Sequence, residues 1–574
     1  MVAAIDFGTT FSGWAYSFDF NPSKISCKQW CSGNSISMKA PTTVLIQADG
    51  NTLEAFGYEA EERYAELADE EKHRPYFYFQ RFKMMLFDNK HLTRNGDLAD
   101  DSGKRLPAKR VFTMVIKYLK DDLMEDSRKR LTGIVKEEEI QWVLTVPAIW
   151  TPPAKQFMRE CAVEAGIRSQ NLLIALEPEA ASLYCKYRMI EKQDKENRRE
   201  SEVVFSFKPG EKYMVVDAGG GTVDIIVHEV CIDGTLKEIY KANGGNWGGT
   251  KVDKAFQDFI TGIFGKDVMK RFQDEHKGDF LDLQREFELK KRFIKPDLES
   301  KIKFKIPVSL FDIYKNMNQE SIMKNIENDE KLSGKLTFLT DKALFDCSLF
   351  KNLFTTTNNS IIQHLKCILE VELTANTNAI LMVGGFSESP MLFEAVRSSF
   401  KDRNIILPED AGLSVLRGAV IFGHHRKDIR DRISQYTYGF KMYSTYNSII
   451  HPMDREIITI SNGQKLVLGC FAKLIEVGEI LSADKISRNK DVKPRNDETQ
   501  FTLRLYASKR LNPIFVDEPD CFKIEEINID SGKKIGKIER VVMVQIMCCG
   551  TEFEVQAIHK DTGKQTKSTF TFLD

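Results

Sequence analysis

Two glycine-rich turns between apolar runs constrain the fold of this chain more than any other feature. The residues from Tyr213 to Val227 read Y-M-V-V-D-A-G-G-G-T-V-D-I-I-V, which predicts a strand, a tight turn and a second strand. Consecutive glycines leave backbone N–H groups free to close around a phosphate, and Asp217 at the strand end could hold a metal ion against it. For this stretch alone, an ordinary glycine-rich hairpin is the alternative.

The N-terminus repeats the pattern. The residues from Ala3 to Ala15 read A-A-I-D-F-G-T-T-F-S-G-W-A, so that an apolar strand again ends in an aspartate, Asp6, before a small polar turn and a second apolar strand. Two phosphate hairpins so far apart in sequence predict two lobes that face one nucleotide.

Composition narrows the class of protein. A chain of 574 residues is too long for one core, and its formal charge of −1 argues against nucleic acid as a main partner. No apolar run is long enough to span a bilayer, and the first strand begins at Val2 without room for a signal peptide. Eleven cysteines without framework spacing favour reduced thiols over disulfides or zinc ligands. We therefore expect a cytoplasmic protein, with a nuclear location as an alternative.

The rest of the N-terminal region alternates strands and helices. The aromatic and basic stretch from Tyr76 to Leu86 could stack on nucleic acid, but core packing explains it better in a chain of neutral charge. Asn243 opens a third glycine-rich turn whose N–H groups could point at an anion. The expected strands are 42–46, 140–147, 172–176 and 379–385; the expected helices are 54–71, 152–165, one from 177, 280–292 and 408–423; and 191–202 is expected to be a solvated loop.

The composition of the sequence changes at Arg426. Charged residues as far as Ser434 predict a linker, which we place at 426–436. Beyond it, the short alternating runs 456–460, 501–506, 541–547 and 553–558 are separated by polar turns, which predicts an all-β module over 437–574.

These motifs, and the order in which they follow one another along the chain, resemble those of the 70-kilodalton heat-shock chaperone family, within the actin and sugar-kinase superfamily. Phe7, Trp14 and the early C-terminal end are most similar to a divergent branch of that family, the heat-shock 70 kDa protein 12 branch. The segments that carry the resemblance are the two phosphate loops 6–10 and 217–224, the connecting segments 145–148 and 177–181, the nucleotide motifs 248–249 and 383–385, and the hairpin 558–564.

The resemblance implies an α/β fold: an actin-like, two-lobed nucleotide-binding domain with a duplicated ribonuclease H-like plan over 1–425, followed by a β-sandwich that binds extended peptide, without a helical lid. It implies a first lobe at about 1–210, a second at about 211–378 and a return to the first at about 379–425. The cofactors that it implies are ATP or ADP and Mg²⁺. The implied partners are peptide or protein clients of the β domain, with co-chaperones or exchange factors as further candidates.

The resemblance also assigns roles to residues. It implies metal binding by Asp6, Asp217 and Asp224, and catalysis by Thr9, Lys83, Glu177 and Asp217, with Arg81 as the alternative to Lys83 because the local match slips. The implied nucleotide-binding residues are Gly8, Thr9, Thr10, Phe11, Gly219, Gly220, Gly221, Thr222, Gly248, Gly249, Glu288, Lys291, Arg292, Lys295, Gly384, Gly385, Phe386, Glu388 and Glu409.

Several positions depart from the family pattern. Phe386 and Glu388 stand where common members have a serine and a base-stacking arginine, so the base pocket is altered. The linker lacks the leucine-rich run that passes the nucleotide state between domains, and the chain stops at Asp574 without an acidic tail. A slow ATPase chaperone is the favoured function. A nucleotide-binding scaffold or sensor with little turnover and a small-molecule kinase of the same superfamily are the alternatives.

Overall fold

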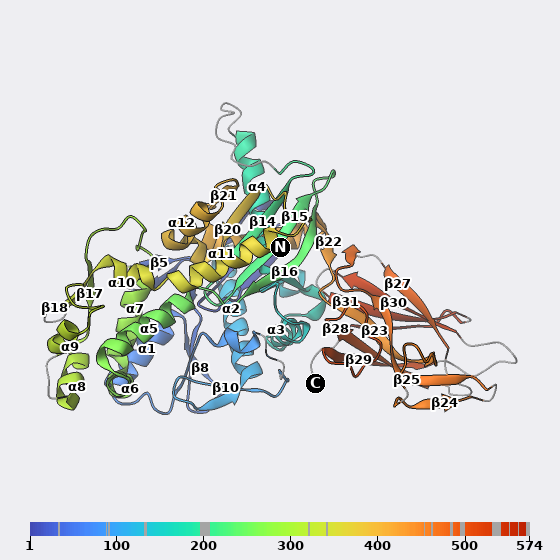
Figure 1. The fold of residues 1–574 in the computed structure, drawn as a ribbon, viewed down its shortest axis with the longest axis horizontal. Helices are drawn as coiled ribbons and strands as arrows, with labels where there is room; N and C mark the ends of the chain where they lie inside the picture. The colour runs from blue at the N-terminus through green and yellow to red at the C-terminus, as the bar shows by residue number, and fades with distance from the viewer. Residues whose placement is uncertain are drawn as a thin grey trace.

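The computed structural model describes the chain except residues 33–34, 88, 90–91, 131–134, 196–206, 319–321, 340–341, 453, 461–462, 483–485, 494–499, 531–540, 550–551, 561 and 570–574. Its elements form a mixed α/β structure, which confirms the coarse fold class expected from the sequence. The helices α5 to α9 lie toward one end of the molecule and the orange and red C-terminal strands at the other (Figure 1). Among the described residues, no helix is both long and apolar enough to cross a membrane.

The first large sheet has the order β13-β12-β1-β2-β3, with the two-residue β6 beside β2. Strands β12 and β13 extend it on one side of β1 in parallel, and β2 and β3 on the other side in antiparallel. We call this sheet the first lobe, together with the helices and small sheets that lie between its strands in the chain and with helix α4, which follows β13. Its large-sheet strands are β1 (Val2–Asp6), β2 (Phe11–Phe18), β3 (Asn21–Cys27), β6 (Ala40–Pro41), β12 (Gln141–Val146) and β13 (Leu172–Leu176).

The other elements of the first lobe are mostly helices and short strands. The helices are α1 (Tyr58–Asp69), α2 (Ala108–Arg130), α3 (Pro152–Glu164) and α4 (Glu177–Lys195), with the 3-10 helices η1 (Phe82–Leu86), η2 (Glu137–Glu139) and η3 (Ser169–Asn171). The short strands are β4 (Trp30–Ser32), β5 (Ser35–Ser37), β7 (Thr43–Ile46), β8 (Leu53–Phe56), β9 (Phe77–Gln80), β10 (Asp97–Ala99) and β11 (Arg105–Pro107).

The second large sheet repeats the plan of the first, because β20 and β21 run parallel to β14 on one side while β15 and β16 are antiparallel on the other. Its order is β21-β20-β14-β15-β16-β22-β26, and we call it the second lobe with its helices. Its strands are β14 (Lys212–Ala218), β15 (Val223–Val230), β16 (Leu236–Gly245), β20 (Ala379–Val383), β21 (Asn404–Ile406), β22 (Ile429–Ile433) and β26 (Ile480–Ser482).

Helices make up most of the rest of the second lobe. They are α5 (Thr250–Phe264), α6 (Lys266–Glu275), α7 (Lys277–Lys291), α8 (Val308–Asn318), α9 (Ile322–Asn328), α10 (Cys347–Asn352), α11 (Thr355–Leu369) and α12 (Pro390–Ser399). A small sheet joins them, formed by β17 (Ile302–Lys305), β18 (Leu336–Phe338) and β19 (Lys342–Phe345). The chain then passes through η5 (Gly385–Glu388) and η6 (Ala411–Leu413) to α13 (Ser414–His424) and η7 (Arg426–Asp428).

Two expectations about the path of the chain are wrong. The return to the first lobe does not begin at 379, because β20 and β21 extend the second sheet; the chain reaches the first lobe with α13, which packs on β1 and α4. The segment expected to be a linker contains strand β22, which pairs with β16 and with β26. A strand from the C-terminal region therefore completes the sheet of the second lobe.

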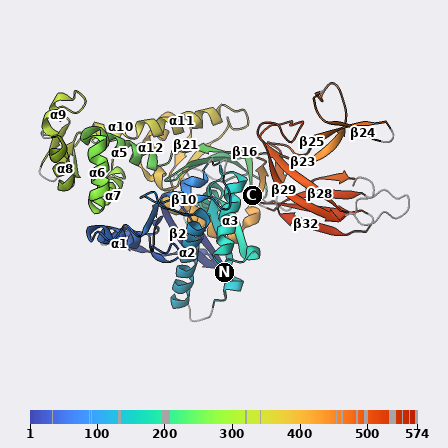
Figure 2. The same ribbon diagram turned by 90° about the horizontal axis from the view of Figure 1, so that it is seen from below.

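The C-terminal region consists of two further sheets in its described part. One has the order β24-β25-β23-β28-β29 and the other β27-β30-β31-β32. Their strands are β23 (Thr437–Thr445), β24 (Ile457–Thr459), β25 (Lys465–Ile475), β27 (Ile486–Val492), β28 (Gln500–Ser508), β29 (Cys521–Asp530), β30 (Val542–Cys549), β31 (Glu552–His559) and β32 (Gln565–Thr569). Figure 2 shows these strands together beside β16, away from α6 to α9.

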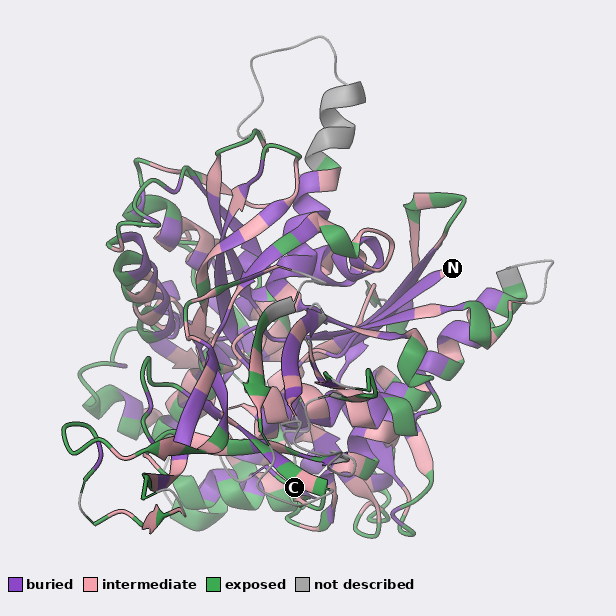
Figure 3. Ribbon diagram, turned by 90° about the vertical axis from the view of Figure 1, so that its right-hand side faces the viewer, coloured by how far each residue is buried: buried purple, intermediate pink, exposed green. Residues whose placement is uncertain are grey.

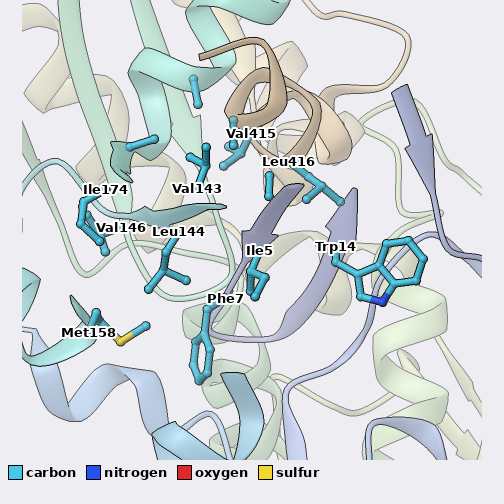
Figure 4. Close-up of a cluster of buried hydrophobic side chains, with 14 of the residues drawn as sticks. Ile5, Phe7, Trp14, Val143, Leu144, Val146, Met158, Ile174, Val415 and Leu416 are labelled. Carbon is cyan, nitrogen blue, oxygen red and sulfur yellow. The ribbon is translucent and has the colours of Figure 1, made fainter. Parts of the chain in front are cut away.

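Three large buried apolar clusters hold the described chain together, and the first of them extends from the first lobe to strands of the second sheet, including Val215 and Leu381. In the first lobe, Ile5, Leu144 and Leu416 are buried where β1, β12 and α13 meet (Figure 4). In the C-terminal region, Leu503 and Val544 come from different sheets and share one cluster. Buried residues concentrate in the strands and on one side of the helices, while exposed residues lie in loops and on the opposite side of the helices (Figure 3).

Most of the expected elements are present, with shifted bounds. The stretch 54–71 begins with β8 before α1, and the helix expected from Pro408 begins only at Ser414, after η6. The charged run 191–202 is not a loop at its start, because α4 continues to Lys195; residues 196–202 lie outside the described residues. Tyr78, Phe79 and Phe82 are buried, which confirms core packing for the aromatic stretch.

Candidate functional site

The two glycine hairpins face each other across a cavity of about 450 Å³ between the lobes. A Cβ added to Gly220 would lie 2.3 Å from Thr10 Oγ1, and one added to Gly221 would lie 2.5 Å from Thr9 Oγ1. Only glycine permits the β14–β15 turn to approach the β1–β2 turn this closely. The sequence prediction of two facing hairpins is therefore met in the folded chain.

Side chains and backbone around each turn fix its shape. In the first turn, the Gly8 N–H donates to Ser12 Oγ at 3.1 Å, and Thr42 Oγ1 donates to the Gly8 carbonyl at 2.8 Å. In the second, the N–H groups of Gly248, Gly249 and Thr250 donate to the carbonyls of residues 221, 219 and 220. The expectation that the third glycine-rich turn points its N–H groups at an anion is wrong for these three, because they hold the β14–β15 turn in place.

Four carboxylates gather below the hairpins, at the ends of β1 and β14, at the start of α4 and in β15. Thr145 Oγ1 donates to Asp6 at 2.9 Å, and Asp224 accepts from the Ile149 N–H and from Thr222 Oγ1, each at 2.9 Å. Burial raises the pKa of Asp224. Burial and then the neighbouring Glu177 raise the pKa of Asp217 well above its usual value. Burial likewise raises the pKa of Glu177 to about 7.

After burial, repulsion between the neighbouring carboxylates raises the pKa values of Glu177 and Asp217 further. Asp6, Glu177, Asp217 and Asp224 carry four negative charges when ionised, against two on Lys39 and Lys83, which pair with Asp6 and Glu177, so Asp217 and Asp224 have no ion-pair partner in this group. That deficit matches one Mg²⁺, which prefers a few carboxylates and retains several waters. Among the described residues, no three such side chains converge closely enough to form a metal site by themselves. The donor set fits a hydrated Mg²⁺ better than a closed cage.

Lys83 and Arg81 were alternatives for one role, and the structure separates them. Lys83 in η1 lines the cavity, and its ammonium lies 2.7 Å from Glu177 and 5.0 Å from the centre of the Trp150 ring. Arg81 instead forms an ion pair of 2.8 Å with Asp253 in α5 of the other lobe. Lys83 is therefore the one of the two that reaches the carboxylates.

Lys39 was missed by the sequence analysis. Its ammonium lies 2.6 Å from Asp6 Oδ2 and 2.8 Å from the Gly412 carbonyl, and it lines the cavity. Burial acts to lower the pKa of Lys39, but the Asp6 carboxylate outweighs burial and the pKa is raised. A lone lysine before a two-residue strand carries no sequence signal for such a position.

At the other end of the cavity, the predicted base-contacting residues are engaged with one another. Glu288 pairs with Lys291 at 2.5 Å and with Arg292 at 2.8 Å. The Arg292 guanidinium stands 5.4 Å from the centre of the Phe11 ring, which brings α7 onto the first hairpin. Glu388 Oε1 accepts the Gly412 N–H at 2.8 Å.

The structure brings most of the predicted site together. Asp224 and Gly248 support the site from outside the cavity lining, whereas Lys295 and Glu409 are exposed and do not line it. The predicted residues that line the cavity are Asp6, Gly8, Thr9, Thr10, Phe11, Lys83, Glu177, Asp217, Gly219, Gly220, Gly221, Thr222, Gly249, Glu288, Lys291, Arg292, Gly384, Gly385, Phe386 and Glu388.

Comparison with known proteins points to one family. A family model described as "Hsp70 protein" matches residues 80–426. "Heat shock 70 kDa protein 12A" of Mus musculus is 31% identical over 628 aligned residues, which cover 100% of this chain and 92% of that protein. "Heat shock 70 kDa protein 12B" of Homo sapiens is 29% identical over 635 residues, covering 100% and 91%.

A shorter match extends to the bacterial members. "Chaperone protein DnaK" of Endomicrobium trichonymphae is 26% identical over 271 residues, which cover 47% of this chain and 37% of that protein. The family model thus spans much of both lobes, and the two mammalian relatives align over the full chain. This chain belongs to the Hsp70 family, and within it to the divergent branch of the heat shock 70 kDa proteins 12A and 12B.

Proposed function

We propose that this chain is an atypical Hsp70-type chaperone that binds ATP, hydrolyses it slowly and couples the nucleotide state to the binding of a peptide or protein. The meeting of the two glycine hairpins above buried carboxylates carries the proposal, because this geometry suits a polyphosphate with its counter-ion. Membership of the Hsp70 family supports nucleotide binding independently.

Different residues of the cavity have different roles in phosphoryl transfer. Thr9, Thr10 and the N–H groups of residues 220–222 hold the phosphates, whereas the Gly219 N–H donates to the Thr222 carbonyl and closes the turn. Positioning of this kind dominates such reactions. The Lys83 ammonium, fixed between Glu177 and Trp150, orients the attacking water. Bound Mg²⁺ would supply positive charge against the phosphate oxygens, with Asp6, Asp217 and Asp224 as its direct or water-mediated partners.

Closure of the two lobes is the proposed link between nucleotide and partner. Arg81 pairs with Asp253, and Arg285 pairs with Glu61 at 3.2 Å, so ion pairs already join the lobes. A nucleotide that favours one arrangement of the lobes shifts the population toward it. The second lobe passes that shift to the C-terminal region through the strands that they share.

Clients would bind to the C-terminal sheets, which we propose form a β-sandwich without a helical lid. Backbone pairing and shallow apolar pockets would provide the contacts. Ile449 and Ile480 are apolar side chains of this region that stand 89% and 59% exposed. Co-chaperones or exchange factors are further candidate partners. A cytoplasmic location, or a nuclear one, is proposed because the eleven cysteines of the sequence lack the spacing of a disulfide framework.

Release of phosphate from ATP by the purified full chain tests the proposed reaction. We expect Mg²⁺-dependent release that falls by about 10- to 100-fold in Asp217→Asn, because that substitution removes one of the site's carboxylates. Asp274→Asn, an exposed position with the same change of chemistry, is the matched control. Equal rates in wild type and Asp217→Asn would contradict the reaction proposed.

A nucleotide-binding scaffold with little turnover is the second candidate. It is favoured by the base end of the cavity, where the Glu388 carboxylate is bound to the Gly412 N–H and Phe386 is buried. Calorimetric titration with ATP, ADP and GTP separates the two candidates when combined with the release assay. Tight binding with no release above the buffer rate would assign the scaffold role.

A further inference from the structure

Lys39 is held in the cavity by the backbone that carries it. Directly after it, Ala40 and Pro41 form β6, which pairs with Ser12 and Phe11 at the start of β2. Because β2 begins at the end of the first phosphate hairpin, the position of Lys39 is coupled to that hairpin. The Lys39 side chain lies in a fixed relation to the turn at Thr9 and Thr10 rather than on a free loop.

The Lys39 ammonium has hydrogen-bonding capacity left over. An ammonium carries three N–H donors. Two have acceptors, Asp6 Oδ2 at 2.6 Å and the Gly412 carbonyl at 2.8 Å. The third has no acceptor among the described residues, although the side chain is only 16% exposed and lines the cavity. A nearly buried cation with an unused donor next to a phosphate turn is suited to an anionic oxygen.

The position of Lys39 also reduces the negative charge that a metal ion has to neutralise. Its ammonium neutralises Asp6, the carboxylate at the end of β1, which leaves a smaller negative charge facing an incoming polyphosphate. A site whose only cations came from bound metal would repel the phosphates as soon as the metal was removed. Here a covalently attached cation remains.

We propose that Lys39 is a phosphate-binding residue, which donates to an oxygen of a bound nucleoside diphosphate or triphosphate and allows the cavity to retain nucleotide without a divalent cation. The inference rests on the proposed function, since it concerns the same nucleotide site. It assigns a ligand contact that the family motifs in the sequence do not indicate.

Calorimetric titration of the full chain with ADP, in excess EDTA and in excess Mg²⁺, tests the proposal. For wild type we expect removal of Mg²⁺ to weaken binding by less than about tenfold. Lys39→Met should weaken metal-free binding by about 10- to 150-fold, the range for loss of a charge-assisted hydrogen bond, and should affect binding in Mg²⁺ less. Lys39→Arg should restore most of the affinity. Lys303→Met, an exposed lysine on β17, is the matched control and should bind like wild type.

A second substitution separates direct contact from an effect through Asp6. Lys39→Met leaves Asp6 without its partner, so its charge alone could repel the phosphates. If Lys39 contacts phosphate, the Lys39→Met/Asp6→Asn chain should remain as weak in EDTA as Lys39→Met. Full recovery in the double variant, or metal-free binding by Lys39→Met as tight as wild type, would overturn the inference. Circular dichroism confirms that each variant is folded.

The same titrations distinguish failure of this inference from failure of the proposed function. If the wild-type chain binds ADP in Mg²⁺ but its affinity for ADP falls 100-fold or more in EDTA, only the role of Lys39 is overturned. Wild-type chain that binds neither ADP nor ATP under any condition would overturn the nucleotide site itself.

Discussion

The buried ion pair between Arg432 in β22 and Glu179 in α4 offers the sharpest test of how the regions are joined. Arg432 Nε lies 2.7 Å from Glu179 Oε1 and Nη2 lies 2.9 Å from Oε2, and the two side chains are only 9% and 2% exposed. Arg432→Met keeps an apolar stem of similar length but leaves Glu179 buried without its partner, and removal of one member of a buried pair costs about 3–5 kcal/mol.

Urea denaturation followed by intrinsic fluorescence would measure the free energy of unfolding. Arg430→Met is a matched control two residues away on the same strand: Arg430 is 44% exposed and pairs with Asp431 at 2.9 Å, so its loss should cost less than about 1 kcal/mol. The Glu179→Met/Arg432→Met chain should lose less than the sum of the single variants, because residues in direct contact are coupled. The ion pair would be shown to contribute little if the Arg432 and Arg430 variants were equally stable. The same would follow if the losses of the two single variants, Glu179→Met and Arg432→Met, added up to the loss of the double variant.

Three further predictions follow from the site and its surroundings. Gly220→Ala places a Cβ 2.3 Å from Thr10 Oγ1, so we expect calorimetry to show ADP binding weakened by about tenfold or more, with partial recovery in Gly220→Ala/Thr10→Gly; unchanged affinity in the single variant would contradict the facing hairpins. Burial raises the pKa of Glu238 to about 8, so the folded chain holds this proton more tightly than the unfolded chain does, and the stability that it contributes is lost as pH rises through 8. Between pH 6.5 and 8, Glu238→Gln should therefore lose less stability than wild type in thermal unfolding followed by circular dichroism, and equal slopes would argue against this effect. Mg²⁺ and ADP at 100 times the dissociation constant should stabilise the chain by about 2.7 kcal/mol, and an unchanged unfolding midpoint would show that no specific complex forms.

Local chemistry was sufficient to predict the centre of the site. The strands β14 and β15 flank the 219–222 turn as expected, because an apolar run that ends in aspartate and glycines has few alternatives to a hairpin. The same holds for β1 and β2. Strand bounds in the C-terminal region also followed the alternating apolar pattern, as in β28 and β31.

Long-range contacts explain what the sequence could not predict. Arg430, Asp431 and Arg432 show no apolar alternation, yet they form β22, because the free edge of β16 supplies hydrogen bonds and Glu179 supplies a buried partner. No sequence motif indicates Lys39, because its place in the cavity depends on contacts with Asp6 and with Gly412, which is distant in sequence. Helix α13 starts later than expected because 411–413 form η6, whose Gly412 contacts both Glu388 and Lys39.

The sharing of β22 and β26 affects where this chain can be divided. A shortened chain that ends at 425, the boundary expected from the sequence, would leave residues 236 and 237 of β16 without the strand that pairs with them, and would leave Glu179 without the Arg432 guanidinium. Long exposed edges are templates for aggregation, whereas the intact sheet ends on β26, which is only three residues long. The C-terminal region thus covers the start of β16 with a strand of its own and ends this side of the sheet on a short strand, in addition to any partner that it binds.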